Sequence, residues 1–242
     1  MTGFYGEALA HIHDEGYTRL AGKAAEVLLA ELRDAGVERG TVVELGCGSG
    51  AGVEILARAG HDVTGYDLSD AMLAIARERV PAARFVHASF LDAELPNCDA
   101  VCAIGEVLGY AADERNGTAA LRDLFVRVHA ALREGGVFLF DLAGPGRVPV
   151  GEVRRHSAEG EGWAYTSSSR VEPDTNVLVR DIELVRGGAR EREVHRLLLQ
   201  DPESVVHDLE AAGFQVETRA AYGDLELPPG LTAFVARLRS IV

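Results

Sequence analysis

Short apolar runs and helical repeats alternate through the first 142 residues of this chain. Apolar side chains recur every three or four positions in four segments, which predicts amphipathic helices at 17–35, 51–59, 70–80 and 118–133. Five short apolar runs predict buried strands at 41–45, 61–66, 83–88, 98–105 and 137–142. Strands that alternate with helices favour a mostly parallel sheet covered on both faces. We therefore expect a doubly wound α/β core that binds ligands beyond the carboxyl ends of its strands.

The pattern changes after residue 142. A cluster of glycine and proline is followed by three segments of β-like alternation, at 162–172, 177–186 and 190–200. The turn signals PDTN and GG separate these segments, so we expect an inserted antiparallel β meander. A helix capped by Asp201 and ended by Gly213 then leads into two last strands, at 214–222 and 231–238.

The sequence VVELGCGSGAGVEIL, residues 42–56, leads from a strand into a helix through several glycines. Gly46 and Gly48 let the backbone turn tightly and approach a ligand, because they carry no Cβ. Asp67 ends the next predicted strand, 21 residues after Gly46, where its carboxylate can accept hydrogen bonds from ribose hydroxyls. These features fit either a nicotinamide dinucleotide or S-adenosylmethionine.

Glu44 favours the second of these ligands. It lies two residues before Gly46, close to where a dinucleotide would place a pyrophosphate that a carboxylate repels. S-adenosylmethionine carries an ammonium and a sulfonium, which a carboxylate attracts by a few kcal/mol at about 4 Å in a partly screened site. We therefore expect Glu44 to face the cationic end of the ligand.

The segments VVELGCGSGAG and VTGYDLS resemble the class I S-adenosylmethionine-dependent methyltransferases, in particular the small-molecule branch with glycine N-methyltransferase-like and sugar N-methyltransferase enzymes. The resemblance covers residues 41–142, and the two last strands fit the reversed hairpin of that family. It implies a seven-stranded, mostly parallel sheet with a C-terminal antiparallel hairpin. It also implies S-adenosyl-L-methionine as cofactor and S-adenosyl-L-homocysteine as product.

The same resemblance implies a set of cofactor contacts. Asp67 would bind the ribose, and Ser89 stands where many members of the family carry an aspartate, with Asp92 three residues further on. The residues implied to surround the cofactor are Glu44, Gly46, Cys47, Gly48, Asp67, Leu68, Met72, Ser89, Phe90, Ile104 and Gly105.

The chain divides into four parts on this interpretation. We expect an N-terminal helical cap at 1–40 and a cofactor-binding Rossmann-like core at 41–148. An inserted antiparallel sheet at 149–200 would cover the substrate, and a C-terminal helix and β-hairpin at 201–242 would complete the core.

Catalytic and substrate-binding candidates lie where these parts meet. Methyl transfer from a sulfonium requires alignment and exclusion of water more than a dedicated catalytic group. The candidate bases are His11, His13, Glu106 and His195. The candidate substrate-binding residues are Tyr5, Tyr17, Asp141, Arg147, Trp163, Arg170 and Tyr222. The two N-terminal histidines have no evident further ligands, so we expect no metal site.

Composition and charge narrow the function classes. Of 242 residues 47% are hydrophobic, enough for a sizeable core, and no apolar run approaches the roughly 20 residues of a membrane span. The net charge is −14 and Lys23 is the only lysine, so we expect neither a nucleic-acid nor a membrane partner. The chain starts without the basic and apolar regions of a signal peptide, so we expect a cytoplasmic location. Cys47, Cys98 and Cys102 form no disulfide framework, and Cys98 and Cys102, which flank a predicted strand, are interpreted as core residues.

These observations lead to one main hypothesis. The chain would be an S-adenosylmethionine-dependent transferase that methylates an O or N atom of a small organic molecule by in-line displacement. The alternatives are a nicotinamide-dependent oxidoreductase and a non-catalytic methyltransferase-like binding module. The identity of the acceptor and the oligomeric state are left open, with a homodimer as one option.

Overall fold

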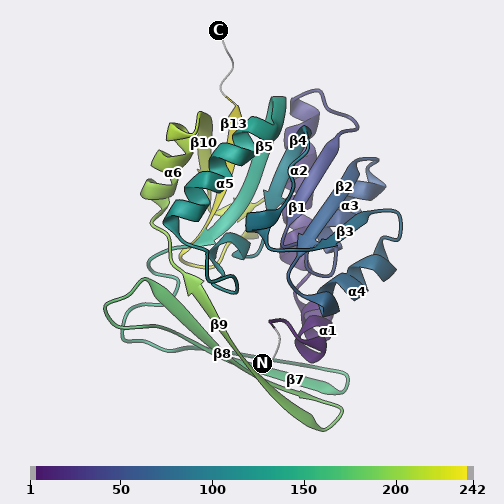
Figure 1. Cartoon of the computed structure of the whole chain (residues 1–242). Coiled ribbons are helices and arrows are strands. Elements are labelled where there is room, and N and C mark those ends of the chain that lie inside the picture. The colour runs from purple at the N-terminus through teal and green to yellow at the C-terminus, as the bar shows by residue number, and fades with distance from the viewer. Residues whose placement is uncertain (1–3, 239–242) are drawn as a thin grey trace.

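A computed structural model describes residues 4–238 of the chain. Its centre is a seven-stranded sheet with the order β10-β13-β5-β4-β1-β2-β3 (Figure 1). Strands β1 to β5 are parallel, whereas β13 pairs antiparallel with both β5 and β10. The strands are β1 (Thr41–Leu45), β2 (Asp62–Asp67), β3 (Arg84–His87), β4 (Cys98–Ala103), β5 (Leu132–Ala143), β10 (Phe214–Arg219) and β13 (Leu231–Leu238). The expected α/β fold class is therefore confirmed.

Helices cover both faces of this sheet because adjacent strand residues point to opposite sides. Val42 packs in one apolar cluster with α2 (Arg19–Asp34) and α3 (Ala51–Arg58). Val43 packs in the other with α5 (Thr118–Ala131) and α6 (Pro202–Ala211). The continuous apolar sequence of the central strands reflects this burial on both faces.

Two of the predicted helices begin at a side-chain cap. Ser69 accepts a hydrogen bond from the amide of Met72 at 3.1 Å and begins α4 (Asp70–Arg79). Asp201 accepts from the amide of Ser204 at 3.0 Å and precedes Pro202 in α6. Such caps satisfy amide groups that have no partner within the helix.

A separate four-stranded antiparallel sheet has the order β6-β7-β8-β9. Its strands are β6 (Arg154–Gly160), β7 (Trp163–Val171), β8 (Val177–Arg186) and β9 (Ala189–Leu198). The sequence predicted only the last three, because the strand RRHSAEG is almost entirely exposed and shows no apolar alternation. We call this four-stranded sheet the second sheet.

The helix α1 (Glu7–Gly16) lies between α4 and the second sheet (Figure 1). Its Leu9 and Ile12 are buried against Trp163 and Ile182 of the second sheet. The smaller elements are η1 (Phe90–Asp92), η2 (Val107–Gly109), β11 (Ala221–Tyr222) and β12 (Leu225–Glu226). No helix within residues 4–238 combines the length and apolar character of a membrane span.

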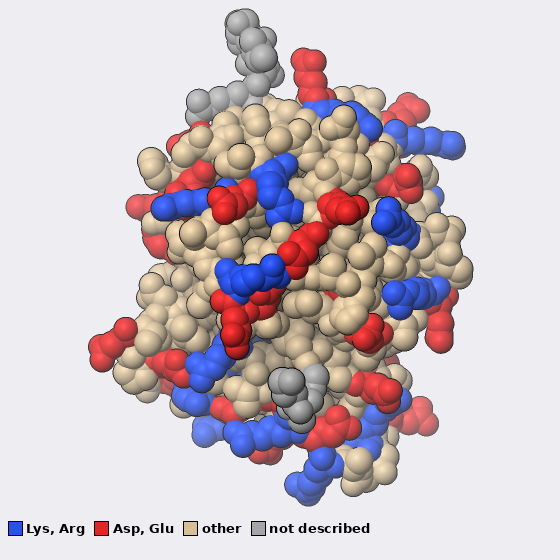
Figure 2. All heavy atoms as spheres, viewed as in Figure 1, with Lys and Arg blue, Asp and Glu red and all other residues tan. Residues whose placement is uncertain are grey.

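Acidic and basic side chains are interleaved over the face of the molecule that Figure 2 shows. The net charge of −14 is therefore not expressed there as one uniformly acidic area. Acidic and basic side chains are instead segregated in the two cavities described next.

Candidate functional site

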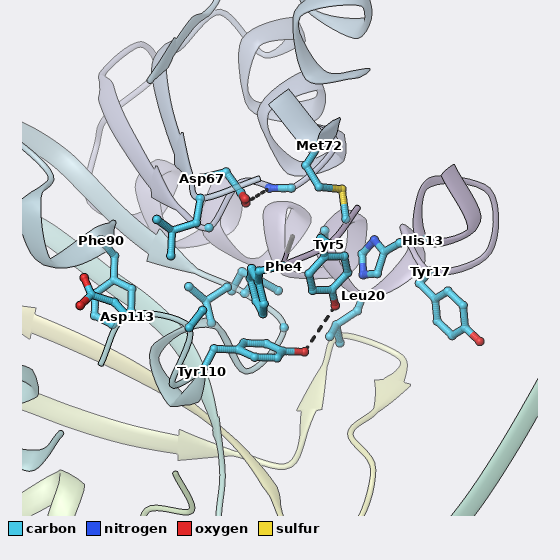
Figure 3. A pocket seen from close by; sticks show the side chains of 18 of the residues that line it. Phe4, Tyr5, His13, Tyr17, Leu20, Asp67, Met72, Phe90, Tyr110 and Asp113 are labelled. Carbon is cyan, nitrogen blue, oxygen red and sulfur yellow. Dashed lines mark hydrogen bonds between the residues drawn. The ribbon is translucent and has the colours of Figure 1, made fainter. Parts of the chain in front are cut away.

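The loops that follow β1, β2 and β4 meet the segment that precedes α1 at the carboxyl edge of the core sheet. They enclose the first cavity, which holds about 830 Å³ of atom-free space up to and including its open mouth (Figure 3). The first cavity is lined by Phe4, Tyr5, His13, Tyr17, Leu20, Ala21, Gly46, Gly48, Asp67, Leu68, Met72, Ala88, Phe90, Ile104, Gly105, Val107, Tyr110, Ala112 and Asp113. Most of the predicted cofactor contacts are among these residues.

Asp67 is fixed on the wall of the first cavity by two backbone groups. Its Oδ2 accepts from the amide of Gly48, as Figure 3 shows, and its Oδ1 accepts from the amide of Ser69, both at 2.8 Å. Burial raises the pKa of this carboxyl, while the amides favour its ionised form. Each oxygen retains a lone pair, so the group can still accept hydrogen bonds from a ligand.

Glycines shape the same wall. Gly46 has φ +66°, and a Cβ there would lie 2.5 Å from the methyl carbons of Val107. Gly105 has φ +94°, and a Cβ there would meet no other atom within 4 Å, so any larger residue would project into free space beside the cavity. Gly46 therefore needs glycine for both its backbone conformation and its clearance, and Gly105 is favoured as glycine by its backbone conformation alone.

Glu44 does not lie on the wall of the first cavity, contrary to the expectation of direct contact. It lines a narrow cavity behind Ala21 and Ile104, and these two residues also line the first cavity. Its carboxylate lies over Gly52 at the start of α3, where a Cβ would lie 2.7 Å from Oε1. Burial, with a further contribution from Asp67, raises the pKa of Glu44 to about 8. Its Oε2 has no hydrogen-bond partner among the described residues.

Cys47 and Ser89 also lie off the wall. Cys47 is buried behind the glycine loop, where its Sγ would lie 2.7 Å from a Cβ on Gly65. Ser89 is buried and caps η1 by accepting from the amide of Leu91 at 3.3 Å. The acidic side chain next to Phe90 is that of Asp113, which the sequence did not single out (Figure 3).

A second cavity adjoins the first, between the sheet edge and the second sheet. It is lined by Tyr5, Leu9, His13, Tyr17, Leu20, Gly105, Glu106, Tyr110, Arg147, Val148, Arg154, Arg155, His156, Tyr165, Ser167, Ser169, Leu178, Arg180, Ile182, Pro228 and Leu231. The residues common to both cavities are Tyr5, His13, Tyr17, Leu20, Gly105 and Tyr110. A ligand in one cavity would therefore share walls with a ligand in the other.

Glu106 is held between two arginines in the second cavity. Its Oε1 accepts from Arg147 Nε at 2.7 Å, and its Oε2 accepts from Arg180 Nη2 at 2.8 Å. Arg180 also donates to the hydroxyl of Tyr110 at 3.1 Å. Burial opposes ionisation of Glu106, but the two arginines outweigh it and lower the pKa of its carboxyl. A carboxylate so paired is a poor proton acceptor, which weighs against its predicted role as a base.

Asp141 and Tyr222 support this loop from behind and do not line either cavity. The Asp141 carboxylate accepts from the amides of Gly105, at 3.0 Å, and Glu106, at 2.6 Å. The hydroxyl of Tyr222 donates to the same carboxylate at 3.0 Å. Because Glu106 has φ +64°, these bonds hold a backbone conformation that few non-glycine residues adopt. Both residues position the loop rather than contact a substrate.

His13 lines both cavities, whereas His11 does not line either. A helix places residues two apart on different faces, so His11 faces outward and pairs with Glu15 at 3.5 Å. The ring of His13 packs between those of Tyr5 and Tyr17, with centroid distances of 5.4 and 5.8 Å (Figure 3). Burial lowers the pKa of His13 to about 4, and its Nδ1 has no hydrogen-bond partner among the described residues.

Three further candidates lie outside both cavities. Trp163 packs against α1 and donates its indole N–H to Glu15. Arg170 pairs with Asp181 at 2.5 Å on the exposed face of the second sheet. His195 is buried behind the segment before α1 and is bonded to Glu193 at 2.8 Å. Arg170 lies on the face of the second sheet away from the cavity. Trp163 and His195 share the face of Ser169 and Arg180, but α1 covers Trp163, and Phe4 and Tyr5 pack on His195.

Glu193 fixes the segment that closes the first cavity. It accepts from the amides of Tyr5 and Gly6, both at 2.9 Å. The carbonyl of Tyr5 accepts from the hydroxyl of Ser69 at 2.6 Å, next to Asp67. The segment is thus bonded both to the second sheet and to the core.

Sequence reasoning missed several residues of the second cavity, namely Tyr110, Arg154, Arg155, His156 and Arg180. One signal was present for Arg180, since a charged residue interrupts the alternation of VLVRDIELVR. In the structure it lies opposite Ser169 of β7, on the side of the sheet that lines the cavity.

Comparisons with known proteins agree with this architecture. A family model described as a methyltransferase domain matches residues 42–136. A trans-aconitate 2-methyltransferase from Paracidovorax citrulli is 33% identical over 171 residues, which cover 66% of this chain and 62% of that protein. The chain thus spans about three fifths of the length of this curated relative.

Two other similarities extend over more of the chain. A dTDP-3-amino-3,6-dideoxy-alpha-D-glucopyranose N,N-dimethyltransferase from Streptomyces fradiae is 28% identical over 222 residues, covering 88% of this chain and 86% of that protein. The solved structure of the sugar N-methyltransferase KedS8 from Streptoalloteichus has a TM-score of 0.73 and 25% identity, and the match covers 99% of this chain and 98% of that one. The second sheet is therefore included in the structural match.

Proposed function

The chain belongs, through its core, to the S-adenosylmethionine-dependent methyltransferases, and on this premise we propose that it transfers the methyl group of S-adenosyl-L-methionine to an O or N atom of a small molecule. The first cavity would hold the cofactor, and the second cavity would hold the acceptor. The residues common to both cavities would surround the reacting atoms.

The polar lining of the first cavity carries this proposal. Its acidic groups are Asp67 and Asp113, of which Asp113 is paired with Arg115 at 2.6 Å, and no Lys or Arg is found among the described residues that line it. A diphosphate would find no side-chain cation there and would depend on backbone amides alone, next to a carboxylate. A nucleoside with a sulfonium and an ammonium would meet no positively charged side chain in this lining. The charge of this lining therefore favours the cationic ligand, and it takes the place of the expected direct contact of Glu44, which lies behind the wall.

The chain's own groups fit the parts of such a ligand. The free lone pairs of Asp67 suit ribose hydroxyls, and Leu68, Met72 and Phe90 supply an apolar surface for a planar base. When bound, the cofactor supplies a methyl group already activated by a positively charged sulfur. The protein then has to align the acceptor and exclude water, which the shared aromatic wall of Tyr5, Tyr17 and Tyr110 favours.

His13 is the best placed of the candidate bases. It faces both cavities, it is neutral near pH 7 because burial lowers its pKa to about 4, and its Nδ1 is unpartnered in the part of the chain described. A neutral imidazole can accept a hydrogen bond from an O–H or N–H of the acceptor. It also adds no positive charge beside a sulfonium.

Titration calorimetry with S-adenosyl-L-homocysteine tests the proposal. We expect saturable binding at one site, and no measurable binding of reduced nicotinamide adenine dinucleotide under the same conditions. Binding of the dinucleotide, or no binding of S-adenosyl-L-homocysteine at millimolar concentration, would contradict the proposal. Turnover with a small-molecule panel would separate an enzyme from a domain that only binds the cofactor.

A further inference from the structure

The second cavity is strongly basic in a chain whose net charge is −14. Four arginines line it, at positions 147, 154, 155 and 180, against a single carboxylate, that of Glu106. If all five groups are ionised, the lining carries a formal charge of +3. Charges of one sign that gather in a hollow with low-dielectric walls attract ligands of the opposite sign.

The arginines form an inner and an outer pair. In the inner pair, Arg147 and Arg180 are both largely buried and share the one carboxylate of Glu106. Each uses one N–H group for that bond, and the planar guanidinium has five. Both arginines of the inner pair therefore keep N–H groups that can bind a ligand. Together with Glu106, they carry one net positive charge.

The outer pair is Arg154 and Arg155 of β6. Both are among the residues that line the second cavity and are exposed, and neither forms an ion pair with another described residue. Arg154 lies opposite Ser169, on the cavity side of the sheet, whereas the side chain of Arg155 starts from the other side of this edge strand. His156 follows them in the same lining and is bonded to Tyr17 at 2.9 Å. The outer pair thus offers two uncompensated charges that nothing else in the described fold uses.

We propose that the methyl acceptor is a small molecule with several anionic oxygens, one group held by Arg147 and Arg180 and another attracted by Arg154, with Arg155 adding to the local positive charge. This inference rests on the proposed function and specifies the substrate class of that enzyme. Carboxylates and phosphates share the required chemistry, because both match the guanidinium fork through two oxygens. An acceptor with only positive charge would be repelled.

An anionic acceptor also needs no strong base in the second cavity, where His13 can accept a hydrogen bond but burial lowers its pKa to about 4. Glu106 is locked between two arginines, and burial keeps the pKa values of Tyr5, Tyr17 and Tyr110 above their ordinary value. A carboxylate oxygen reaches the site already ionised, so it attacks the methyl carbon without first losing a proton. The carbon–sulfur bond breaks as the carbon–oxygen bond forms, and its electron pair stays on sulfur.

Calorimetry on the full chain saturated with S-adenosyl-L-homocysteine tests this inference. The probes are propane-1,2,3-tricarboxylate, its triamide, butyrate and a nucleoside diphosphate sugar. We expect the tricarboxylate or the sugar nucleotide to bind at least about tenfold more tightly than butyrate and the triamide, with an affinity that falls as salt is added. Which of the two binds more tightly distinguishes a polycarboxylate from a phosphate-bearing acceptor.

A pair of double variants with equal charge change locates the site. We expect R154Q/R155Q to weaken binding of the preferred anion by roughly tenfold and to leave binding of S-adenosyl-L-homocysteine unchanged. The matched control is R186Q/R190Q, which removes two exposed arginines at the far end of the second sheet. There Arg186 is the cross-strand neighbour of Trp163, whereas Ser169, which lines the cavity, is the neighbour of Arg154 and Arg180. It should change anion binding less than twofold.

Two results would overturn the inference. One is equal affinity for the tricarboxylate, the sugar nucleotide and the triamide, and the other is an equal effect of both double variants. The same titrations without S-adenosyl-L-homocysteine examine the anion site by itself. Loss of cofactor binding alone would count against the proposed function, whereas loss of anion preference with intact cofactor binding would count against the anionic acceptor.

Discussion

The two cavities share a wall but differ in charge and in construction. The first cavity is acidic and is built mainly from loops that follow consecutive strands of the core sheet. The second cavity is basic and draws its arginines from β6, β8 and the loop after β5, which become neighbours only in the folded chain. A cationic nucleoside in the first cavity and an anionic molecule in the second would therefore each meet side chains of the opposite charge, although the two cavities share a wall.

The separation depends on the loop that follows β4. Gly105 lines both cavities, and Glu106 turns its carboxylate into the second one, where it offsets one of four arginines. Asp141 fixes both residues from the core through their amides. Changes on either side of this loop should therefore affect one cavity and leave the other largely intact.

The largest effect is expected from Glu106→Gln. The change leaves two largely buried arginines without their carboxylate, and breaking such a group typically costs about 3–5 kcal/mol of unfolding free energy. Urea denaturation followed by circular dichroism measures the loss. Glu172→Gln serves as control, since its exposed pair with Arg196 is worth about 0–1 kcal/mol. A similar small loss for both variants would show that the arginines are not held by Glu106.

A smaller effect, confined to the first cavity, is expected from Asp67→Asn. The amide keeps the size of the side chain but weakens its charge-assisted hydrogen bonds, worth roughly 1.5–3 kcal/mol each, so S-adenosyl-L-homocysteine should bind about 10–100-fold more weakly. Calorimetry gives the ratio. Asp70→Asn, three residues further on and exposed, should leave affinity unchanged. If both variants bind alike, the ribose assignment of Asp67 is wrong.

A third effect concerns the pH dependence of stability through Glu44. Its pKa is about 8 in the folded protein, above its ordinary value near 4.5, so the unfolded chain gives up this proton at lower pH than the folded one. Stability from this group is full below about pH 4.5 and is lost as the pH rises to about 8. Glu44→Gln should remove that loss of stability at high pH. Between pH 5 and pH 8.5 its melting temperature should therefore gain on that of the original chain, by roughly 2–4 °C for each kcal/mol of unfolding free energy.

Parallel melting curves of the original chain and of Glu54→Gln complete this comparison. Glu54 is a partly exposed residue of α3 that pairs with Arg58, so its replacement should leave the slope with pH nearly as it was. An identical pH profile for all three proteins would mean that Glu44 is ionised in the folded state. The narrow cavity would then have to contain a compensating cation.

The core and the first cavity were largely predictable from the sequence, because their signals are local. Helical spacing, the glycines around Gly46 and the acid at the end of β2 each lie within one or two consecutive elements. Glu44 shows the limit of such reasoning. Its position in the sequence was interpreted correctly as the end of β1, but its side chain points behind the wall, toward Gly52.

The second cavity could not be predicted in the same way, because its residues are brought together by strand register and by the packing of α1. Trp163 and Arg180 lie on the neighbouring strands β7 and β8, yet only Arg180 lines the second cavity. Arg154 and Arg155 belong to a polar strand without a periodic signal. Cross-strand neighbours of this kind depend on tertiary structure that no single segment encodes.

The positions of Phe4 and Leu238, the first and last described residues, relative to the site have a practical consequence. Phe4 and Tyr5 form part of the cavity walls, whereas β13 runs antiparallel to β5 and carries Leu238 to the opposite edge of the core sheet (Figure 1). An affinity tag or fluorescent fusion joined ahead of the chain would start only a few residues from bound ligands. Kinetic work and immobilisation are therefore better served by attachment at the carboxyl end.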